Sequence, residues 1–257
     1  MTVSYVVSGF AVGVLVGLTG VGGGSLMTPL LTLLFGIHPS VAVGTDLAFA
    51  SATKTAGTFA HRFKGTVRWD IVRRLSFGAL PAAVVTTLLL KHFGAVSDGM
   101  SLVIRYSIAI SVFLTVIALL FKSKLQAWLN AHPERQLQGL ELSRATILAG
   151  AVLGTLVTIS SIGAGAVGAT LLVLLYPRLS PAEIAGTDIA YAVPLTAIAA
   201  FGHWWLGSID WSLLGALLLG SVPGITIGSL AARAVPEKFL RGLLAITLTS
   251  VALKLIW

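Results

Sequence analysis

The chain of 257 residues contains no cysteine and few charged residues. Without cysteine it can form neither a disulfide framework nor a thiolate metal site. Charged residues make up 10% of the sequence, against about 25% in an average soluble domain. Hydrophobic residues make up 56%, and the mean hydropathy is +0.96. This composition excludes an ordinary soluble globular protein and a disordered chain.

Apolar runs long enough to cross a bilayer occur along the whole sequence. A helix that crosses the hydrocarbon core needs about 20 residues, and nearly charge-free runs of suitable length cover 3–19, 40–60, 71–90, 101–121, 145–160, 181–203, 211–232 and 239–257. Two shorter apolar runs, 23–36 and 164–177, follow glycine-rich breaks and suit broken or re-entrant helices. The runs are continuous rather than alternating, as a β-barrel would require. We therefore predict an all-α polytopic membrane protein with about 8–10 membrane helices.

The N-terminal run carries no charge before Asp46. It therefore lacks the basic segment of a cleaved signal peptide, and we expect it to be retained.

The sequence contains an internal repeat. Gly44-Thr45-Asp46 recurs as Gly186-Thr187-Asp188, an offset of 142 that also pairs His61 with His203, Trp69 with Trp211 and Pro81 with Pro223. An offset of 141 pairs upstream glycines, Gly9 with Gly150 and Gly22 with Gly163 among them. The repeat divides the chain into a first transmembrane half (1–121), a polar linker (122–144) and a second transmembrane half (145–257).

The two halves are expected to have inverted topologies. Each half contains either three or five crossings, depending on whether its short helix re-enters or crosses, and an odd number reverses the direction of the second half. Inverted repeats are typical of secondary transporters, whose binding site lies near the midplane where broken helices meet.

The distribution of basic residues agrees with this inversion. If the loop 61–74 is cytoplasmic, 13 of the 17 Lys and Arg residues lie on the cytoplasmic side, as the positive-inside rule requires. The repeat-related loop 203–216 contains neither Lys nor Arg. The net charge of +8 thus reflects orientation and gives no reason to expect a nucleic-acid partner. The linker 122–144 is predicted to be cytoplasmic and both termini to lie outside.

The two glycine-rich breaks are candidate anion-binding segments. Free backbone N–H groups at the start of a helix attract anions, and two such starts from inverted halves would form an anion cradle near the midplane. The residues that would form it are Gly22, Gly23, Gly24 and Ser25 in the first half and Ser161, Gly163 and Gly165 in the second. The alternative is close helix packing through small residues.

Asp46, Lys54 and Asp188 are charged residues that fall well inside predicted spans. A carboxylate in a span is costly and is by default a functional candidate, so the two aspartates are predicted to carry protons or to act as gates. The alternative is that each Thr-Asp pair, with Thr45 or Thr187, caps a helix that restarts after a break. Lys54 has Thr196 as its repeat counterpart. It would supply counter-charge to an anion, pair with an aspartate, or snorkel to the membrane surface.

Other kinds of site find little support in the sequence. The five histidines are dispersed, so no metal site or cofactor is expected. No nucleophile and base occur together in a recognisable pattern, so we do not expect an enzyme.

Taken together, these segments resemble the TauE/SafE family of sulfite and organosulfur anion exporters. The resemblance covers nearly the whole chain and rests on VGLTGVGGGSLMTPLL (16–31), on 38–75 followed by GALP (78–81), and on the second-half echo 185–211. It implies a multi-pass transporter of the bacterial cytoplasmic membrane that moves small sulfur-containing anions. One departure is that the second break reads Ser-Ile-Gly-Ala-Gly where the first reads Val-Gly-Gly-Gly, so the two breaks are not expected to bind a ligand equivalently.

The sequence thus predicts a secondary transporter that exports sulfite, sulfoacetate or a related sulfonate by alternating access. Protons are the expected coupling ion, since a neutral Asp no longer repels an anion; sodium stays an alternative. A passive anion channel, a carrier of another small anion, and an intramembrane enzyme or scaffold are the competing hypotheses. The oligomeric state is left open, a homodimer included.

Overall fold

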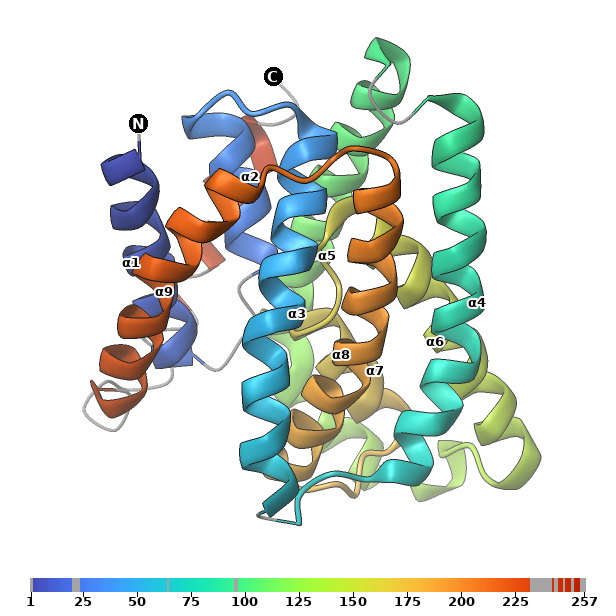
Figure 1. Ribbon diagram of the computed structural model, residues 1–257. Helices are drawn as coiled ribbons and strands as arrows, with labels where there is room; N and C mark the ends of the chain where they lie inside the picture. The colour runs from blue at the N-terminus through green and yellow to red at the C-terminus, as the bar shows by residue number, and fades with distance from the viewer. Residues whose placement is uncertain are drawn as a thin grey trace.

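The computed structural model describes residues 2–19, 24–63, 65–94, 97–231 and scattered positions between 242 and 254. Within these residues every regular element is helical (Figure 1). In chain order the elements are α1 (Thr2–Thr19), α2 (Gly24–Leu34), α3 (Pro39–Phe63), α4 (Trp69–Phe93), α5 (Asp98–Ala131), the 3-10 turn η1 (Pro133–Arg135), α6 (Gly139–Ser160), α7 (Ala166–Leu175), α8 (Pro181–Trp205) and α9 (Trp211–Ala231).

The long helices suit a bilayer in both length and surface. In the part of the chain that the structure describes, α4, α5, α6, α8 and α9 are long and apolar enough to cross a membrane. Large apolar side chains cover their outer surfaces, such as Phe77 of α4, which is 76% exposed, and Ile110 and Phe113 of α5. An apolar surface of this extent would be unfavourable in water and is favourable against lipid. The predicted all-α polytopic membrane fold is confirmed.

The short helices fall where the sequence predicts them. The α2 helix has 11 residues and α7 has 10. At a rise of about 1.5 Å per residue each reaches roughly half-way across the hydrocarbon core. In the second half α6 ends at Ser160, and Ser161 takes a left-handed conformation with φ 60° before α7 begins at Ala166. The residues that join α1 to α2 lie outside the described residues.

The α5 helix continues well beyond its predicted apolar run. It extends ten residues past position 121, to Ala131, into the segment that the sequence marks as a polar linker. Leu125 is half-buried and Leu129, one turn later, is buried, so the extension keeps a helical apolar stripe. The helix ends only before Pro133, and the connection to α6 shortens to residues 132–138. The drop in hydropathy at 122 therefore ends the apolar span without ending the helix.

Helices of one half pack mainly against helices of the other. The α1 helix lies along α9, α6 lies along α4, and α3 lies along α8. Close packing depends on glycine. A Cβ on Gly78 of α4 would collide with the carbonyl oxygen of Ile147 in α6, and a Cβ on Gly220 of α9 would collide with that of Val6 in α1. These two contacts are related by the sequence repeat.

The α3 and α8 helices at the centre run antiparallel. The Thr45 hydroxyl, near the start of α3, accepts a hydrogen bond of 3.1 Å from the amide of Asp210, just after α8. The Thr187 hydroxyl, near the start of α8, accepts an equal bond from the amide of Arg68, just after α3. The connection 206–210 therefore lies at the same end as the start of α1, opposite the connection 65–68 (Figure 1).

Candidate functional site

Three buried charged side chains lie where α3 and α8 pack together. Asp46 is 0% exposed, Lys54 is 8% exposed and Asp188 is 4% exposed. Asp46 and Lys54 are two turns apart on α3, about 12 Å along its axis. Buried charges of this kind persist only when they are paired, hydrogen-bonded or functional, so the partners of each group decide what the cluster can do.

Lys54 is held at the break between α6 and α7. Its Nζ donates a hydrogen bond of 2.9 Å to the carbonyl oxygen of Ala164. Both Asp46 and Asp188 act on it electrostatically, yet the ion pairs closer than 4.0 Å within the described residues involve only Arg68. Lys54 therefore neither snorkels to the surface nor forms a direct salt bridge. Its charge is available between two carboxylates.

Asp188 reaches the same break from α8. The backbone N–H of Gly165, just before α7 begins, lies near its carboxylate. A Cβ at Gly168, one turn into α7, would collide with the Asp188 Oδ1, so only glycine lets the carboxylate approach the helix start so closely. The carboxylate of Asp188 therefore lies at the second break, and anion binding by this break stays a prediction. Oδ1 of Asp188 has no hydrogen-bond partner.

Asp46 binds to the first half's short helix. The Thr28 hydroxyl of α2 donates a hydrogen bond to the Asp46 Oδ2. The Ser161 hydroxyl also lies near this carboxylate, but neither the hydroxyl nor the Asp46 Oδ1 has a partner at hydrogen-bonding distance. Asp46 is thus better satisfied than Asp188, and it faces the second break from the opposite side.

Four buried atoms of this cluster have no hydrogen-bond partner: the Oδ1 atoms of Asp46 and Asp188, the Ser161 Oγ near Asp46, and the Tyr191 hydroxyl near Asp188. A buried polar atom without a partner typically costs about 1–3 kcal/mol, so such groups are rare in native proteins. Two of the four are hydroxyls that can donate to an anion, and Lys54 adds a cation. The cluster has the chemistry of a site that is completed by a small polar ligand.

Sequence reasoning missed Tyr191 and Thr28. Tyr191 is fully buried on α8, lies one turn after Asp188, and replaces Phe49 of the first half in the repeat. A phenol in the place of a phenyl ring, three residues from a buried Asp, is a signal that could have identified it. Thr28 offers no such signal, because its bond to Asp46 depends on how α2 packs against α3.

The remaining predicted site residues are placed as follows. Gly163 and Gly165 form the second break with φ 137° and 140°. Thr45 and Thr187 join the two halves through the amides of Asp210 and Arg68. The α3 and α8 helices run through these threonines without a break. The alternative that Thr45 and Thr187 cap helices restarting after a break is therefore wrong.

The first glycine-rich break is only partly described. Gly24 and Ser25 begin the backbone of α2, whereas Gly22 and Gly23 lie outside the described residues. No group of three or more side chains that could hold a metal ion occurs in the part of the chain that the structure describes.

The helices and the buried polar cluster describe a multi-pass helical membrane protein with charged groups inside its spans. Comparison with known proteins defines the class more narrowly. The family model described as "Sulfite exporter TauE/SafE" matches residues 5–255. The chain therefore belongs to the TauE/SafE family, as its motifs predict.

Similar proteins carry only general names. The chain is 41% identical over 231 residues to the "Probable membrane transporter protein YjnA" of Bacillus subtilis (strain 168), with 89% of each chain covered. It is 27% identical to a "Probable membrane transporter protein" of Xylella fastidiosa (strain 9a5c), over 97% of this chain and 93% of the other. It is also 27% identical to the protein YdhB of Bacillus subtilis (strain 168), with 93% of each chain covered. No solved structure matches the chain.

Proposed function

We propose that this protein is a secondary active transporter that exports a small sulfur-containing anion, such as sulfite, sulfoacetate or a related sulfonate. The observation that carries the proposal is the position of Lys54, a buried cation bound to the helix break at Ala164, in a cluster whose carboxylates lie near the unpartnered hydroxyls of Ser161 and Tyr191. A tetrahedral or pyramidal oxyanion accepts several hydrogen bonds, and Lys54, Ser161 and Tyr191 can donate them. The family description supports a sulfur oxyanion as the substrate.

The charges of the site support coupling to protons. With Asp46 and Asp188 both ionised and Lys54 protonated, the site carries a net charge of −1 and repels an anion. Each proton taken up by an aspartate raises the net charge by one and turns a carboxylate oxygen into a hydrogen-bond donor. Asp188, which has no hydroxyl partner like the one that Thr28 gives Asp46, is the stronger candidate for the proton carrier. Anion and proton would then bind to the same state.

The membrane potential would supply the driving force for export. Moving one elementary charge across 100 mV changes the free energy by about 2.3 kcal/mol. A negative cell interior expels anions, and a dianion that leaves with one proton still carries one negative charge outward. Export is therefore compatible with proton binding at Asp188 as long as the complex stays anionic.

We propose alternating access between inverted halves. The antiparallel packing of α3 and α8 and the matching contacts of Thr45 and Thr187 support an inverted duplication. In this arrangement the connection 65–68 and the linker between α5 and α6 face the cytoplasm, and the start of α1 faces the outside. The membrane is the bacterial cytoplasmic membrane.

A passive anion channel of the same fold is the second candidate. It would need a continuous polar path, whereas the described polar groups gather around Lys54 at the centre. A carrier of a different small anion would use the same donors. An enzyme is disfavoured because the family description and the names of the similar proteins are those of transporters.

Counterflow in proteoliposomes tests the carrier proposal. Vesicles are loaded with unlabelled sulfoacetate and diluted into a trace of labelled sulfoacetate with the voltage clamped at zero. A carrier accumulates the label transiently above its outside concentration. Each carrier that releases unlabelled substrate outside can bind labelled substrate there and carry it into the vesicle. A channel only equilibrates the label, and that result would overturn the carrier. Loading with chloride or inorganic phosphate in place of sulfoacetate shows whether the site prefers a sulfonate.

A further inference from the structure

The two oxygens of the Asp46 carboxylate differ in their contacts. Its Oδ2 accepts a hydrogen bond from the Thr28 hydroxyl, whereas its Oδ1 has no partner among the described residues. The Ser161 hydroxyl lies near the same carboxylate from the second half of the chain, and it also has no partner. Both residues are buried, with Asp46 at 0% and Ser161 at 4% exposure. Two buried oxygens without partners at one position are rare in native proteins and mark a place where a further group can bind.

The groups at this position are those that bind a cation. The α6 helix ends at Ser160, directly before Ser161. The last carbonyls of a helix have no partner within it and carry the negative end of the helix dipole. The Asp46 carboxylate adds a full negative charge, and hydroxyl oxygens add lone pairs. Carbonyls at helix breaks and the C-terminal ends of half-helices are the groups that coordinate sodium in transporters built from inverted repeats.

The hydroxyls gather around Asp46 and have no counterparts in the repeat. At the offset of 141 that relates the glycine-rich segments, the counterpart of Thr28 is Ala169. The counterpart of Ser161 at the same offset is Gly20. Neither alanine nor glycine has a side-chain oxygen. The repeat-related positions therefore cannot give the second aspartate the same pair of hydroxyls, and the two aspartates are suited to different ions.

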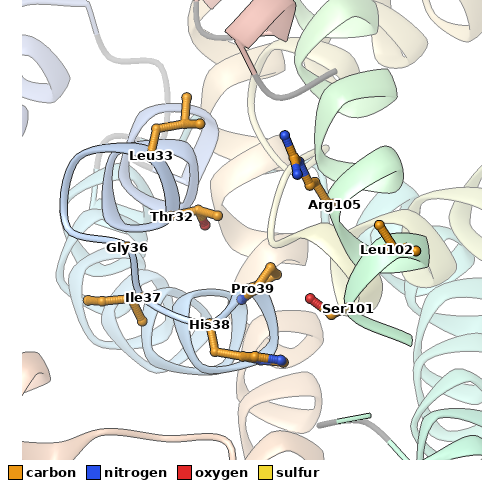
Figure 2. Close-up of a pocket in the computed structure, with 9 residues that line it drawn as sticks. All are labelled: Thr32, Leu33, Gly36, Ile37, His38, Pro39, Ser101, Leu102 and Arg105. Atoms are coloured by element: carbon orange, nitrogen blue, oxygen red, sulfur yellow. The ribbon is translucent and has the colours of Figure 1, made fainter. Parts of the chain in front are cut away.

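A cavity approaches this position from the end of the molecule where α3 begins. Its volume is about 660 Å³, and Figure 2 shows Thr32 on one side of it and Ser101 and Arg105 on the other. The Thr32 hydroxyl donates a hydrogen bond of 2.9 Å to the carbonyl oxygen of Thr28, one turn or about 6 Å away along α2. The cavity is large enough to hold water. Because Arg105 also lines it, the cavity is an approach and not itself the cation site.

We propose that Asp46 and Ser161 bind a monovalent cation, sodium, and that Thr28 orients the carboxylate for it. A single carboxylate balances one positive charge, whereas calcium takes six to eight oxygen ligands and magnesium keeps several waters. The Asp46 Oδ1 and the Ser161 Oγ ligate the ion through lone pairs. The Ser161 O–H can still donate to an anion, because a hydroxyl has two acceptor sites besides its proton.

Sodium at Asp46 changes the charge that an anion meets. With both aspartates ionised and Lys54 protonated, the cluster carries a net charge of −1, and one sodium ion makes it neutral without a proton. Uptake of a single proton by Asp188 then makes the cluster positive. This consequence rests on the proposed function, whereas sodium binding rests on the groups around Asp46 alone and goes beyond that function.

Equilibrium binding of radioactive sodium to the purified full chain tests the proposal. The protein is prepared in detergent with choline chloride and titrated with sodium chloride at constant ionic strength. We expect saturable binding of one ion per chain, which unlabelled sodium displaces at lower concentration than potassium does. The absence of saturable binding would overturn the site, and this is the result expected if Asp46 is protonated instead. Equal or better displacement by potassium would overturn the choice of sodium.

Variants of the two ligands show whether the sodium binds at this position. Asp46→Asn keeps the size of the side chain and should raise the dissociation constant of sodium at least about tenfold, since interactions with charged groups are the strong ones. Ser161→Gly removes the hydroxyl and should also weaken sodium binding. Glycine suits the φ of 60° at position 161, so this variant is expected to fold.

Thr196→Val is the matched control for the lost hydroxyl. Thr196 is 1% exposed, and its hydroxyl donates a hydrogen bond of 2.8 Å to the carbonyl oxygen of Ala192 within α8. We expect its dissociation constant for sodium to stay within about twofold of the parent, as for independent sites. Unchanged binding in Ser161→Gly, or an equal loss in Ser161→Gly and Thr196→Val, would overturn the site.

Lys54→Met separates this proposal from the proposed function. It removes the cation assigned to the anion, and that cation acts electrostatically on Asp46. The variant should therefore lose affinity for sulfoacetate and bind sodium at least as tightly as the parent. If the wild type binds sodium and transports no sulfur anion, the proposed function is wrong and the sodium site stands. If it transports the anion and binds no sodium, the sodium site is wrong and the proposed function stands.

Discussion

Lys54 is the residue on which the anion site most depends. Lys54→Met keeps the length of the side chain and removes the charge and the bond to Ala164. We expect the half-saturating concentration of sulfoacetate in counterflow to rise at least about tenfold, since a charged hydrogen bond contributes roughly 1.5–3 kcal/mol. Lys91→Met, which removes an exposed lysine outside the buried cluster, is the control and should change it by less than about twofold. An unchanged half-saturating concentration in Lys54→Met would remove Lys54 from the site.

Gly168 sets how closely Asp188 approaches the start of α7. In Gly168→Ala the added Cβ would collide with the Asp188 Oδ1, so we expect at least about a tenfold loss of transport rate together with a lower melting temperature. Gly215→Ala is the matched control, because a Cβ there meets no atom within 4 Å. Alanine should stabilise the α9 helix by up to about 1 kcal/mol and leave transport intact. Equal transport rates in the two variants would show that the contact of Gly168 with Asp188 is not needed.

At the residue scale the sequence identifies charges better than their partners. Asp46, Lys54 and Asp188 stand out because any charge within an apolar run is expensive. The group that holds Lys54 is the carbonyl of Ala164, and a backbone atom leaves no trace in the sequence. Tyr191 could have been found by comparing the two halves, since it replaces Phe49.

At the element scale, two matched sets of contacts join the ends of α3 and α8, and we propose that they act as two closures. Thr187 accepts a bond from the amide of Arg68, and Arg68 also forms an ion pair of 3.6 Å with Glu183 at the start of α8. At the other end, the Thr45 hydroxyl accepts a hydrogen bond from the amide of Asp210. The Ser40 hydroxyl donates a hydrogen bond of 2.9 Å to the Ser208 hydroxyl. In alternating access, one closure opens while the other stays shut.

Removing either threonine hydroxyl should shift access in opposite directions. Thr187→Val and Thr45→Val each delete a buried hydrogen bond that contributes about 1 kcal/mol, a factor of roughly five in an equilibrium. In a Ser161→Cys background, Thr187→Val should raise thiol labelling from the side of the connection 65–68 by about that factor. Thr45→Val should do so from the other side. Increases from the same side in both variants would contradict two opposed closures.

The sequence predicts the helices well where apolar runs and helices end together. The runs 23–36 and 164–177 became α2 and α7, because glycine-rich segments interrupt both the hydropathy and the backbone. The end of α5 was missed because a polar segment such as 122–131 can still be helical when it contains good helix formers. Proline at 133, rather than the change in polarity, marks where that helix stops.

At the scale of the whole molecule, the inverted topology can be tested with paired positions. Asp70 and Ser212 are 142 residues apart, are both exposed, and lie in the first turns of α4 and α9. In intact cells, a membrane-impermeant thiol reagent should label Ser212→Cys and should label Asp70→Cys only after the membrane is opened. Labelling of both variants from the same side would refute the inversion. Ser208, which lies just before α9, is fully buried and unsuitable.

The repeat in the sequence predicts the duplication but not how its halves fit together. Offsets of 141 and 142 identify which helices correspond, such as α1 with α6 and α4 with α9. They do not indicate that α1 packs on α9 and α4 on α6, since packing across halves depends on close contacts such as that of Gly78 with Ile147. Each half therefore depends on the other for its core, and we expect neither 1–121 nor 145–257 to fold alone.

Proton movement driven by a sulfonate gradient is the most direct test of the transporter proposed here. Proteoliposomes loaded with sulfoacetate, which stays ionised near neutral pH, and with a pH-sensitive dye are diluted into sulfoacetate-free buffer with the voltage clamped. We expect the interior to become more alkaline as protons leave with the anion. In Asp188→Asn this change should be lost while sulfoacetate exchange continues. An interior pH that does not change in the wild type, or that changes equally in Asp188→Asn, would contradict proton-coupled export through the Lys54–Asp188 site.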